Sequence, residues 1–426
     1  MKRFLLLLII SLPLLAFAQS PLLNRLKQQA EIKKIIPIKP LKGFDQCYLL
    51  YVEQPVNHLK PDSAKFLQRV WLSHRSFNRP VVFITEGYTA PRNYESELAK
   101  LLNTNQIIVE HRFFGQSVPD SLTWQNLNLY QECQDLHNIR RILGKIYKTP
   151  WISTGISKGG QTTIAYKFYF PSDVKASVPY VAPLTIAKED PRVIDFIANK
   201  VGTPQCRKKV LDFQKAVLKH KSELLPLFIN FAKKHGMTFN EVGGYESGFE
   251  HGMLEFSFSF WQWGYNCSDI PHNVLHTDST MKILTQVNPF DFFSDQNNNK
   301  FRPYFYQALT EMGIYTYDTR PFAGLLKYAS DPHFDYVIKD LRPKRYNPCT
   351  NMVMRQWLRY NGNNMIYIYG GYDPWGACAV DVDTTKINAL KLVYPTGSHK
   401  TRIKTFPLST QQRIIDSLSR WTGYKF

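Results

Sequence analysis

A serine stands at the centre of the glycine-rich stretch Gly155-Ile156-Ser157-Lys158-Gly159, which matches the pattern G-x-S-x-G. The apolar run "PWIS" precedes it and the helical pattern "QTTIAYKFYF" follows it. On a sharp turn between a buried strand and a helix, a serine hydroxyl is lifted clear of the sheet and can act as a nucleophile. A plain glycine-rich turn is the alternative for five residues alone, but the strand before and the helix after favour a nucleophile.

An acid and a base for that serine occur later in the chain, in the order typical of α/β-hydrolases. The strand-like run 364–370 ends shortly before Asp373, and the run 390–395 ends shortly before His399. Alone, Asp373 would be an ordinary turn carboxylate and His399 an ordinary loop histidine. Because both follow strands in the expected order, we predict a triad of Ser157, Asp373 and His399.

The negative oxygen formed in such a reaction needs N–H donors. The N–H of Lys158, the residue after the nucleophile, is one candidate. The second should come from the loop after the third strand, "TEGYTAP", where we select the N–H of Tyr88. His111 precedes the serine, which is the wrong order for the base, so we predict that it is structural.

The elements that must position these residues alternate between strand-like and helical patterns up to residue 185 and again from residue 346. This alternation indicates an α/β fold with a mostly parallel sheet and helices on both faces. Residues 186–345 are mostly helical in pattern. We therefore predict a core of residues 19–185 and 346–426, interrupted by a helical cap insertion at 186–345. Residues 21–43 look like a surface leader.

The first 18 residues have the pattern of a signal peptide, with Lys2 and Arg3 before an apolar run and a small-residue site ending at Ala18. A retained anchor is the alternative. We expect an exported protein, periplasmic or secreted, without stable membrane insertion after cleavage. The formal net charge is +19, but Lys and Arg are scattered, which favours a solvated basic surface over nucleic-acid binding.

Six cysteines lie beyond the predicted cleavage site: Cys47, Cys133, Cys206, Cys267, Cys349 and Cys378. An even number in an exported protein suggests disulfides. Cys206 and Cys267 share the predicted insertion and are the pair that we favour. None of the spacings is C-x-x-C, so we expect no zinc site, and nothing in the sequence calls for a cofactor.

Several segments resemble, in order and spacing, a bacterial family of secreted serine tripeptidyl aminopeptidases related to prolyl carboxypeptidase and dipeptidyl peptidase. They are "VEQPVNH", "VVFITEGY", "VEHRFFGQSVP", "TGISKGGQTT", "GYDPWGA" and "GSHKTRI", and the resemblance spans about residues 44 to 423. It implies an α/β-hydrolase core with a helical cap, an acyl-enzyme mechanism and release of short peptides, often after proline or small residues. It also implies the same triad. The family's methionine after the paired glycines is Gln161 here, so the resemblance does not define the depth of the site on the leaving-group side.

An aminopeptidase must hold the free ammonium of its substrate with an anion, because burying an unpaired charge is very costly. In the predicted insertion, Glu255 stands in an apolar neighbourhood, "MLEFSFSFWQW". We predict that Glu255 contacts the ammonium, with Trp261 or Gln262 beside it. Glu86, at the end of the strand before the oxyanion loop, is the rival candidate.

The residues by themselves predict acyl transfer by a serine hydrolase, and only the resemblance indicates a peptide substrate. A serine esterase or lipase of the same fold is one alternative, and a catalytically inactive binding protein is another. A tripeptide is the favoured product, although the sequence alone does not separate it from a dipeptide.

Overall fold

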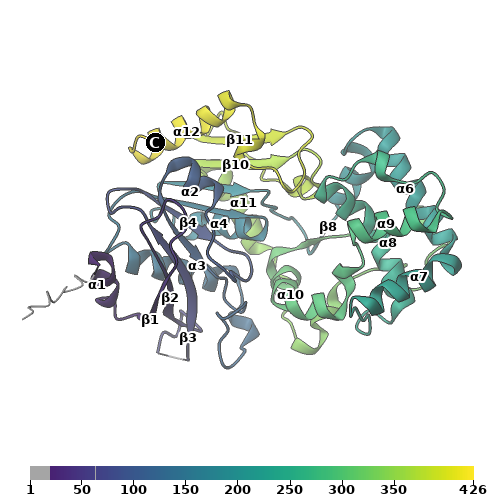
Figure 1. The fold of residues 1–426 in the computed structure, drawn as a ribbon, viewed down its shortest axis with the longest axis horizontal. Helices are drawn as coiled ribbons and strands as arrows, with labels where there is room; N and C mark the ends of the chain where they lie inside the picture. Colours follow the sequence, from purple (N-terminus) through teal and green to yellow (C-terminus); the bar gives the residue numbers. More distant parts are fainter. Residues whose placement is uncertain (1–19, 63) are drawn as a thin grey trace, which may run out of the picture.

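A nine-stranded sheet forms the centre of the protein, in the order β1-β2-β3-β5-β4-β6-β7-β10-β11 (Figure 1). The computed structural model describes residues 20–62 and 64–426, so the predicted signal peptide and its cleavage site at Ala18 lie outside the described residues. The strands are β1 Ile32–Ile38, β2 Gln46–Pro55, β3 Lys65–His74, β4 Val81–Thr85, β5 Asn105–Val109, β6 Trp151–Ile156, β7 Ala176–Tyr180, β10 Met365–Gly370 and β11 Ala389–Tyr394. Pairing is antiparallel from β1 to β5 and parallel from β5 to β11.

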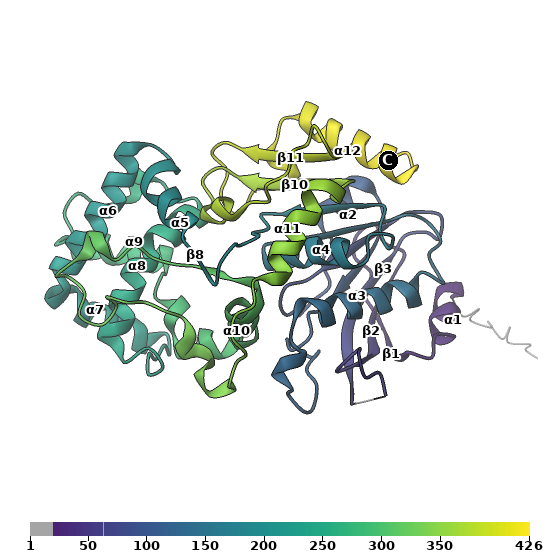
Figure 2. The same cartoon turned by 180° about the vertical axis from the view of Figure 1, so that it is seen from behind.

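Helices cover both faces of this sheet, and successive residues of a buried strand serve opposite faces. In β4, Phe83 joins the core shared with α3 (Leu129–Leu143), α4 (Lys158–Tyr169) and α11 (Cys349–Asn361). Its neighbours Val82 and Ile84 join the core shared with α2 (Glu97–Leu102) and α12 (Leu408–Thr422). Figure 2 shows α3, α4 and α11 together on one side of the sheet. This arrangement is the α/β-hydrolase fold, as predicted.

Residues 186–345, called the insertion below, lie between β7 and α11 and are mostly helical. Their elements are β8 Glu189–Asp190, α5 Arg192–Asp195, η2 Phe196–Lys200, α6 Pro204–Lys219, α7 Lys221–Lys234, α8 Tyr245–Trp263, η3 Cys267–Asp269, α9 Thr277–Val287, η4 Asp291–Phe293, α10 Asp295–Gln307, η5 Ala308–Met312, β9 Ile314–Tyr315, η6 Arg320–Phe322 and η7 Asp335–Leu341. Helices α6 to α9 gather to one side of the sheet, with α10 nearer to it (Figure 1). Most of α8 is buried on every side, as expected for a central helix.

No helix in the described part of the chain is both long enough and apolar enough to cross a lipid bilayer.

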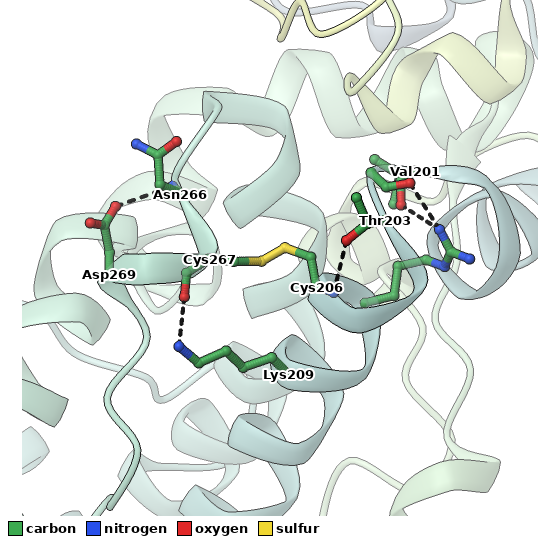
Figure 3. The surroundings of a disulfide bond; sticks show 9 residues. Val201, Thr203, Cys206, Lys209, Asn266, Cys267 and Asp269 are labelled. Atoms are coloured by element: carbon green, nitrogen blue, oxygen red, sulfur yellow. Dashed lines mark hydrogen bonds between the residues drawn. A yellow bond between two sulfur atoms is a disulfide. The ribbon is translucent and has the colours of Figure 1, made fainter.

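One disulfide joins α6 to η3, between Cys206 and Cys267 (Figure 3). The pair favoured from the sequence is therefore confirmed. Beside it, the Lys209 ammonium donates to the Cys267 carbonyl at 2.8 Å, so the same two segments are joined twice. The other cysteines are unbonded, and the expectation of further bridges from the even count is wrong. Three of these four are buried within the packed fold: Cys47, Cys133 and Cys378.

The segment expected to be a surface leader is part of the fold. Residues Pro21–Lys27 form helix α1, in which Leu22 and Leu26 are fully buried. Strand β1 then pairs antiparallel with β2 at the edge of the sheet. An edge strand is paired on one side only, so it tolerates the lysines and the proline of "IKKIIPI" that hide its strand pattern.

Candidate active site

Ser157 occupies the turn between β6 and α4, with φ +57° and ψ −122°. A non-glycine residue rarely adopts a positive φ, and such strain is typical of functional turns. The turn is tight: a Cβ atom placed on Gly159 would lie 2.5 Å from the carbonyl oxygen of Thr85. The Ser157 N–H donates to Tyr180 O at 2.9 Å, while its Oγ has no hydrogen-bond partner among the described residues. The turn therefore presents a free hydroxyl.

The acid and the base predicted from the sequence are hydrogen-bonded to each other. His399 Nδ1 lies 2.6 Å from Asp373 Oδ2. Asp373 is fully buried, and its Oδ1 accepts the N–H of Trp375 at the start of η8 (Pro374–Cys378). Because β6, β10 and β11 run parallel, Ser157, Asp373 and His399 all follow strand ends at the same edge of the sheet.

The end of α8 in the insertion holds the histidine loop. The backbone N–H of His399 donates to Gln262 O at 2.9 Å, and the Trp263 ring stands edge-on to the imidazole at 5.9 Å. The structure thus gives the Gln262 backbone a contact with the base loop. Trp261 is buried and its ring packs against Tyr372, next to Asp373 in the chain.

The two backbone N–H groups predicted as oxyanion donors belong to segments that lie against each other. The N–H groups of Lys158 and Tyr88 have no acceptor among the described residues. The Tyr88 loop lies directly against the start of α4, because a Cβ atom on Gly87 would lie 2.6 Å from Gly159 N. The Tyr88 ring is held edge-on by Phe301 of α10 at 5.4 Å. Both donors are therefore unpaired among the described residues and belong to adjacent segments, and their role as an oxyanion hole remains a prediction.

Glu255 is buried in α8, and its carboxylate is held by three hydroxyl groups. Oε1 accepts from Ser259 at 2.5 Å, while Oε2 accepts from Tyr315 at 2.8 Å and from Tyr317 at 2.7 Å. Among the described residues, no Lys, Arg or His forms an ion pair with it. Burial raises the pKa of Glu255 to about 7, and the three hydroxyl groups offset only part of that effect.

Aromatic contacts connect Glu255 to both sides of the predicted site. The Tyr315 ring lies 5.1 Å from the ring of Trp375, two residues after the acid. Tyr304, which is close enough to Glu255 for their charges to interact, lies 5.9 Å from the Tyr88 ring on the oxyanion side. Tyr315 and Tyr304 therefore connect the surroundings of Glu255 to Trp375 on one side and to Tyr88 on the other.

Glu86, the rival candidate, lies in different surroundings. Its carboxylate accepts from the Tyr94 hydroxyl at 2.6 Å, and burial raises its pKa. It lines a cavity of about 230 Å³ with Ile156, Tyr180 and Arg402. Since Arg402 already supplies a cation in this cavity, Glu86 is the weaker candidate for a substrate ammonium.

The partners of these residues were not found from the sequence. Tyr315 and Tyr317 lie some sixty residues after Glu255, and no pattern links them to it. The Lys158 side chain was also overlooked, because only its backbone was considered. It turns inward and is buried behind the serine turn.

Comparison with known proteins shows the family of the chain. The family model described as PS-10 peptidase S37 matches residues 23–425. A curated relative, the prolyl tri/tetrapeptidyl aminopeptidase of Streptomyces mobaraensis, is 30% identical over 397 residues, which cover 92% of this chain and 83% of the relative.

Solved structures are more distant. A proline iminopeptidase of Mycobacterium smegmatis is 11% identical, with 87% of this chain and 98% of that chain covered and a TM-score of 0.38. A Pyrococcus furiosus esterase is 13% identical, with 92% and 98% covered and a TM-score of 0.37. Scores this low support no functional inference.

Proposed function

The chain belongs to the PS-10 peptidase S37 family and is a serine exopeptidase, and we propose that it releases tripeptides from the free amino termini of oligopeptides. The curated relative's name supports this product length, and also supports cleavage after proline, to which we add small residues. The family match spans nearly the whole chain, so an esterase or lipase activity is not favoured.

Ser157, Asp373 and His399 are the proposed triad. His399 Nε2 takes the proton of Ser157 Oγ as the oxygen attacks the scissile carbonyl, while Asp373 holds the Nδ1–H and stabilises the imidazolium. The N–H groups of Lys158 and Tyr88 receive the negative oxygen. His399 then gives its proton to the leaving amine, and water hydrolyses the acyl-enzyme by the reverse sequence. The 2.6 Å bond between His399 and Asp373 supports these roles.

The observation that carries the exopeptidase proposal is the environment of Glu255. A buried carboxylate with no cationic partner among the described residues is costly, and the ammonium of a substrate would offset that cost. Tyr315 and Tyr317 fix the carboxylate while leaving it able to accept further hydrogen bonds. The terminal ammonium of the substrate, bound at Glu255, would fix the number of residues between the amino terminus and the bond that Ser157 attacks.

The insertion acts in this proposal as a cap over the site. It supplies Glu255 from α8 and Phe301 from α10, and it holds the His399 loop through Gln262. We also propose export through residues 1–18, which is tested by determining the amino terminus of the mature protein in cell fractions. A chain that begins at Met1 and is found only in the cytoplasmic fraction would contradict export.

The test of function compares a pool of free peptides with the same pool after N-acetylation, with the products identified by mass spectrometry. We expect tripeptides from the free pool and a strong preference for free amines. Glu255→Gln should lose most of this preference, by roughly 10- to 100-fold, the value of a charge-assisted hydrogen bond. Glu246→Gln, on the same helix but paired with Lys221 at 2.7 Å, is the matched control and should keep it. If Glu255→Gln still discriminates, the anchor is elsewhere and Glu86→Gln is the next variant.

A further inference from the structure

The side chain of Lys158 has an unusual position for a lysine that follows a nucleophile. Only 2% of the residue is exposed, and its Nζ has no hydrogen-bond partner among the described residues. An ammonium group loses much favourable hydration on burial, so its charge must be compensated by its surroundings.

Titratable groups from several elements face this ammonium. They are Glu132 and Cys133 of α3, Glu311 of η5 in the insertion, His111 after β5, and Tyr88 after β4. Among these groups Glu132 has the largest effect on Lys158; its Oε2 lies 2.5 Å from His111 Nε2, and its Oε1 accepts from Thr162 at 2.7 Å. Lys158 is therefore stabilised by the field of these carboxylates without a direct hydrogen bond.

Aromatic rings complete the surroundings. Lys158 Nζ lies 5.8 Å from the centre of the Tyr88 ring and 5.9 Å from that of Phe114, within the range of cation–π attraction. Tyr88 carries the second predicted oxyanion N–H, and its neighbour Gly87 packs against Lys158 and Gly159. The Lys158 side chain thus contacts the residue that carries the second oxyanion donor, while its own backbone carries the first.

We propose that the Lys158 side chain is a positioning residue for the peptidase reaction, which holds the Tyr88 loop against the serine turn and places a positive charge behind the oxyanion hole. The inference rests on the proposed function. In a site that excludes water, a fixed charge behind the donors favours the negative oxygen of the transition state over the neutral carbonyl of the substrate. It therefore acts on kcat more than on KM.

The charge state of Lys158 predicts a pH dependence of kcat by which the proposal can be tested. Burial lowers the pKa of Lys158 to about 8, although Glu132, Glu311 and Cys133 oppose the shift. The ammonium is charged below that pH and neutral above it, so kcat should fall as pH rises through about 8. The substrate's own amine also titrates near this pH and affects kcat/KM, so kcat at saturating substrate is the quantity to follow.

The experiment measures kcat from pH 6 to 10 on a tripeptide amide of a fluorogenic amine, for the wild type and Lys158→Met. The variant keeps the backbone N–H, and we expect a kcat at pH 7 about 10-fold lower, a smaller loss than deletion of an oxyanion donor causes. Its alkaline fall should disappear. A folded Lys158→Met with the wild-type kcat and the same alkaline fall would overturn the proposal.

Glu311→Gln decides the matter if Lys158→Met does not fold. The Glu311 carboxylate accepts from Leu129 N and from the Thr350 hydroxyl, each at 2.9 Å, and an amide oxygen can keep one of these bonds. Removing its charge takes away an anion that favours the ammonium, so the alkaline fall should move to lower pH. An unmoved fall would overturn the proposal. If Ser157→Ala is inactive while the pH profiles of Lys158→Met and Glu311→Gln match that of the wild type, the proposed role of Lys158 fails and the proposed function does not.

Discussion

Two buried glutamates in different parts of the molecule have opposite pKa shifts. Burial alone would raise the pKa of Glu132 in α3, but the charges of His111 and Lys158 more than offset it and lower the pKa to about 2. Burial raises the pKa of Glu255 in the insertion to about 7, and the hydrogen bonds from Ser259, Tyr315 and Tyr317 offset only part of that rise. Glu132 has the Lys158 ammonium near it within the protein, whereas Glu255 has no cationic partner among the described residues.

This difference separates a structural carboxylate from one suited to a ligand. An ion cluster that is complete in the folded chain joins elements, as Glu132 joins α3 to α4 through Thr162. A carboxylate kept from water without a cation weakens the unliganded protein and gains most when a cation binds. The same residue type can therefore serve the fold in one region and the substrate in the other.

The largest expected effect is that of Ser157→Ala, which tests whether the predicted triad is catalytic. Ser157→Ala should reduce turnover on the order of 10⁴-fold or more, because triad members act as a unit. Its thermal unfolding should match that of the wild type, since the half-buried hydroxyl has no hydrogen-bond partner among the described residues. Near-normal turnover by this folded variant would show that Ser157 is not the nucleophile, and the roles given to Glu132 and Glu255 in relation to this site would lose their basis.

The second prediction compares the glutamates directly in stability. Glu132→Gln should lower the free energy of unfolding by roughly 3–5 kcal/mol, the usual cost of breaking a buried ion pair from one side. Glu255→Gln should cause little or no loss, because a neutral amide can still accept from Ser259, Tyr315 or Tyr317. Urea unfolding of both variants gives the measurement, and each serves as the matched control for the other. Equal losses would show that the contrast in pairing has no energetic meaning.

The placement of the predicted triad residues at strand ends could be read from the sequence because it depends on local pattern and strand order. The glycines around Ser157 mark the turn, and runs of apolar residues place Asp373 and His399 at strand ends. The structure then brings the last two within hydrogen-bond distance. The roles of these residues remain predictions, because the geometry does not measure catalysis.

The environments of the two glutamates were not predictable from the sequence in the same way. Glu255 accepts from Tyr315 and Tyr317, some sixty residues later in the chain, and Glu132 accepts from Thr162 and is affected by the charge of Lys158. Contacts between segments this far apart leave no periodic signal. Strand β1 was missed for a related reason, since its pairing with β2 depends on the exposed edge of the sheet and not on its own composition.

The smallest predicted effect is the pH dependence of amine binding. It compares Glu255 with Glu132 by changing the pH. Because burial raises the pKa of Glu255 to about 7, acidification through that range neutralises the carboxylate while the substrate amine stays protonated. Affinity for a product tripeptide should therefore fall by up to about tenfold per pH unit below 7. Titration calorimetry on Ser157→Ala from pH 5 to 7 measures binding without turnover.

A Ser157→Ala, Glu255→Gln double variant should bind weakly with no such slope. Glu132 titrates far below this window, so Ser157→Ala, Glu132→Gln should keep the slope if it folds. A flat profile in Ser157→Ala itself would mean that Glu255 does not meet the amine, and that its burial serves the packing of α8 alone.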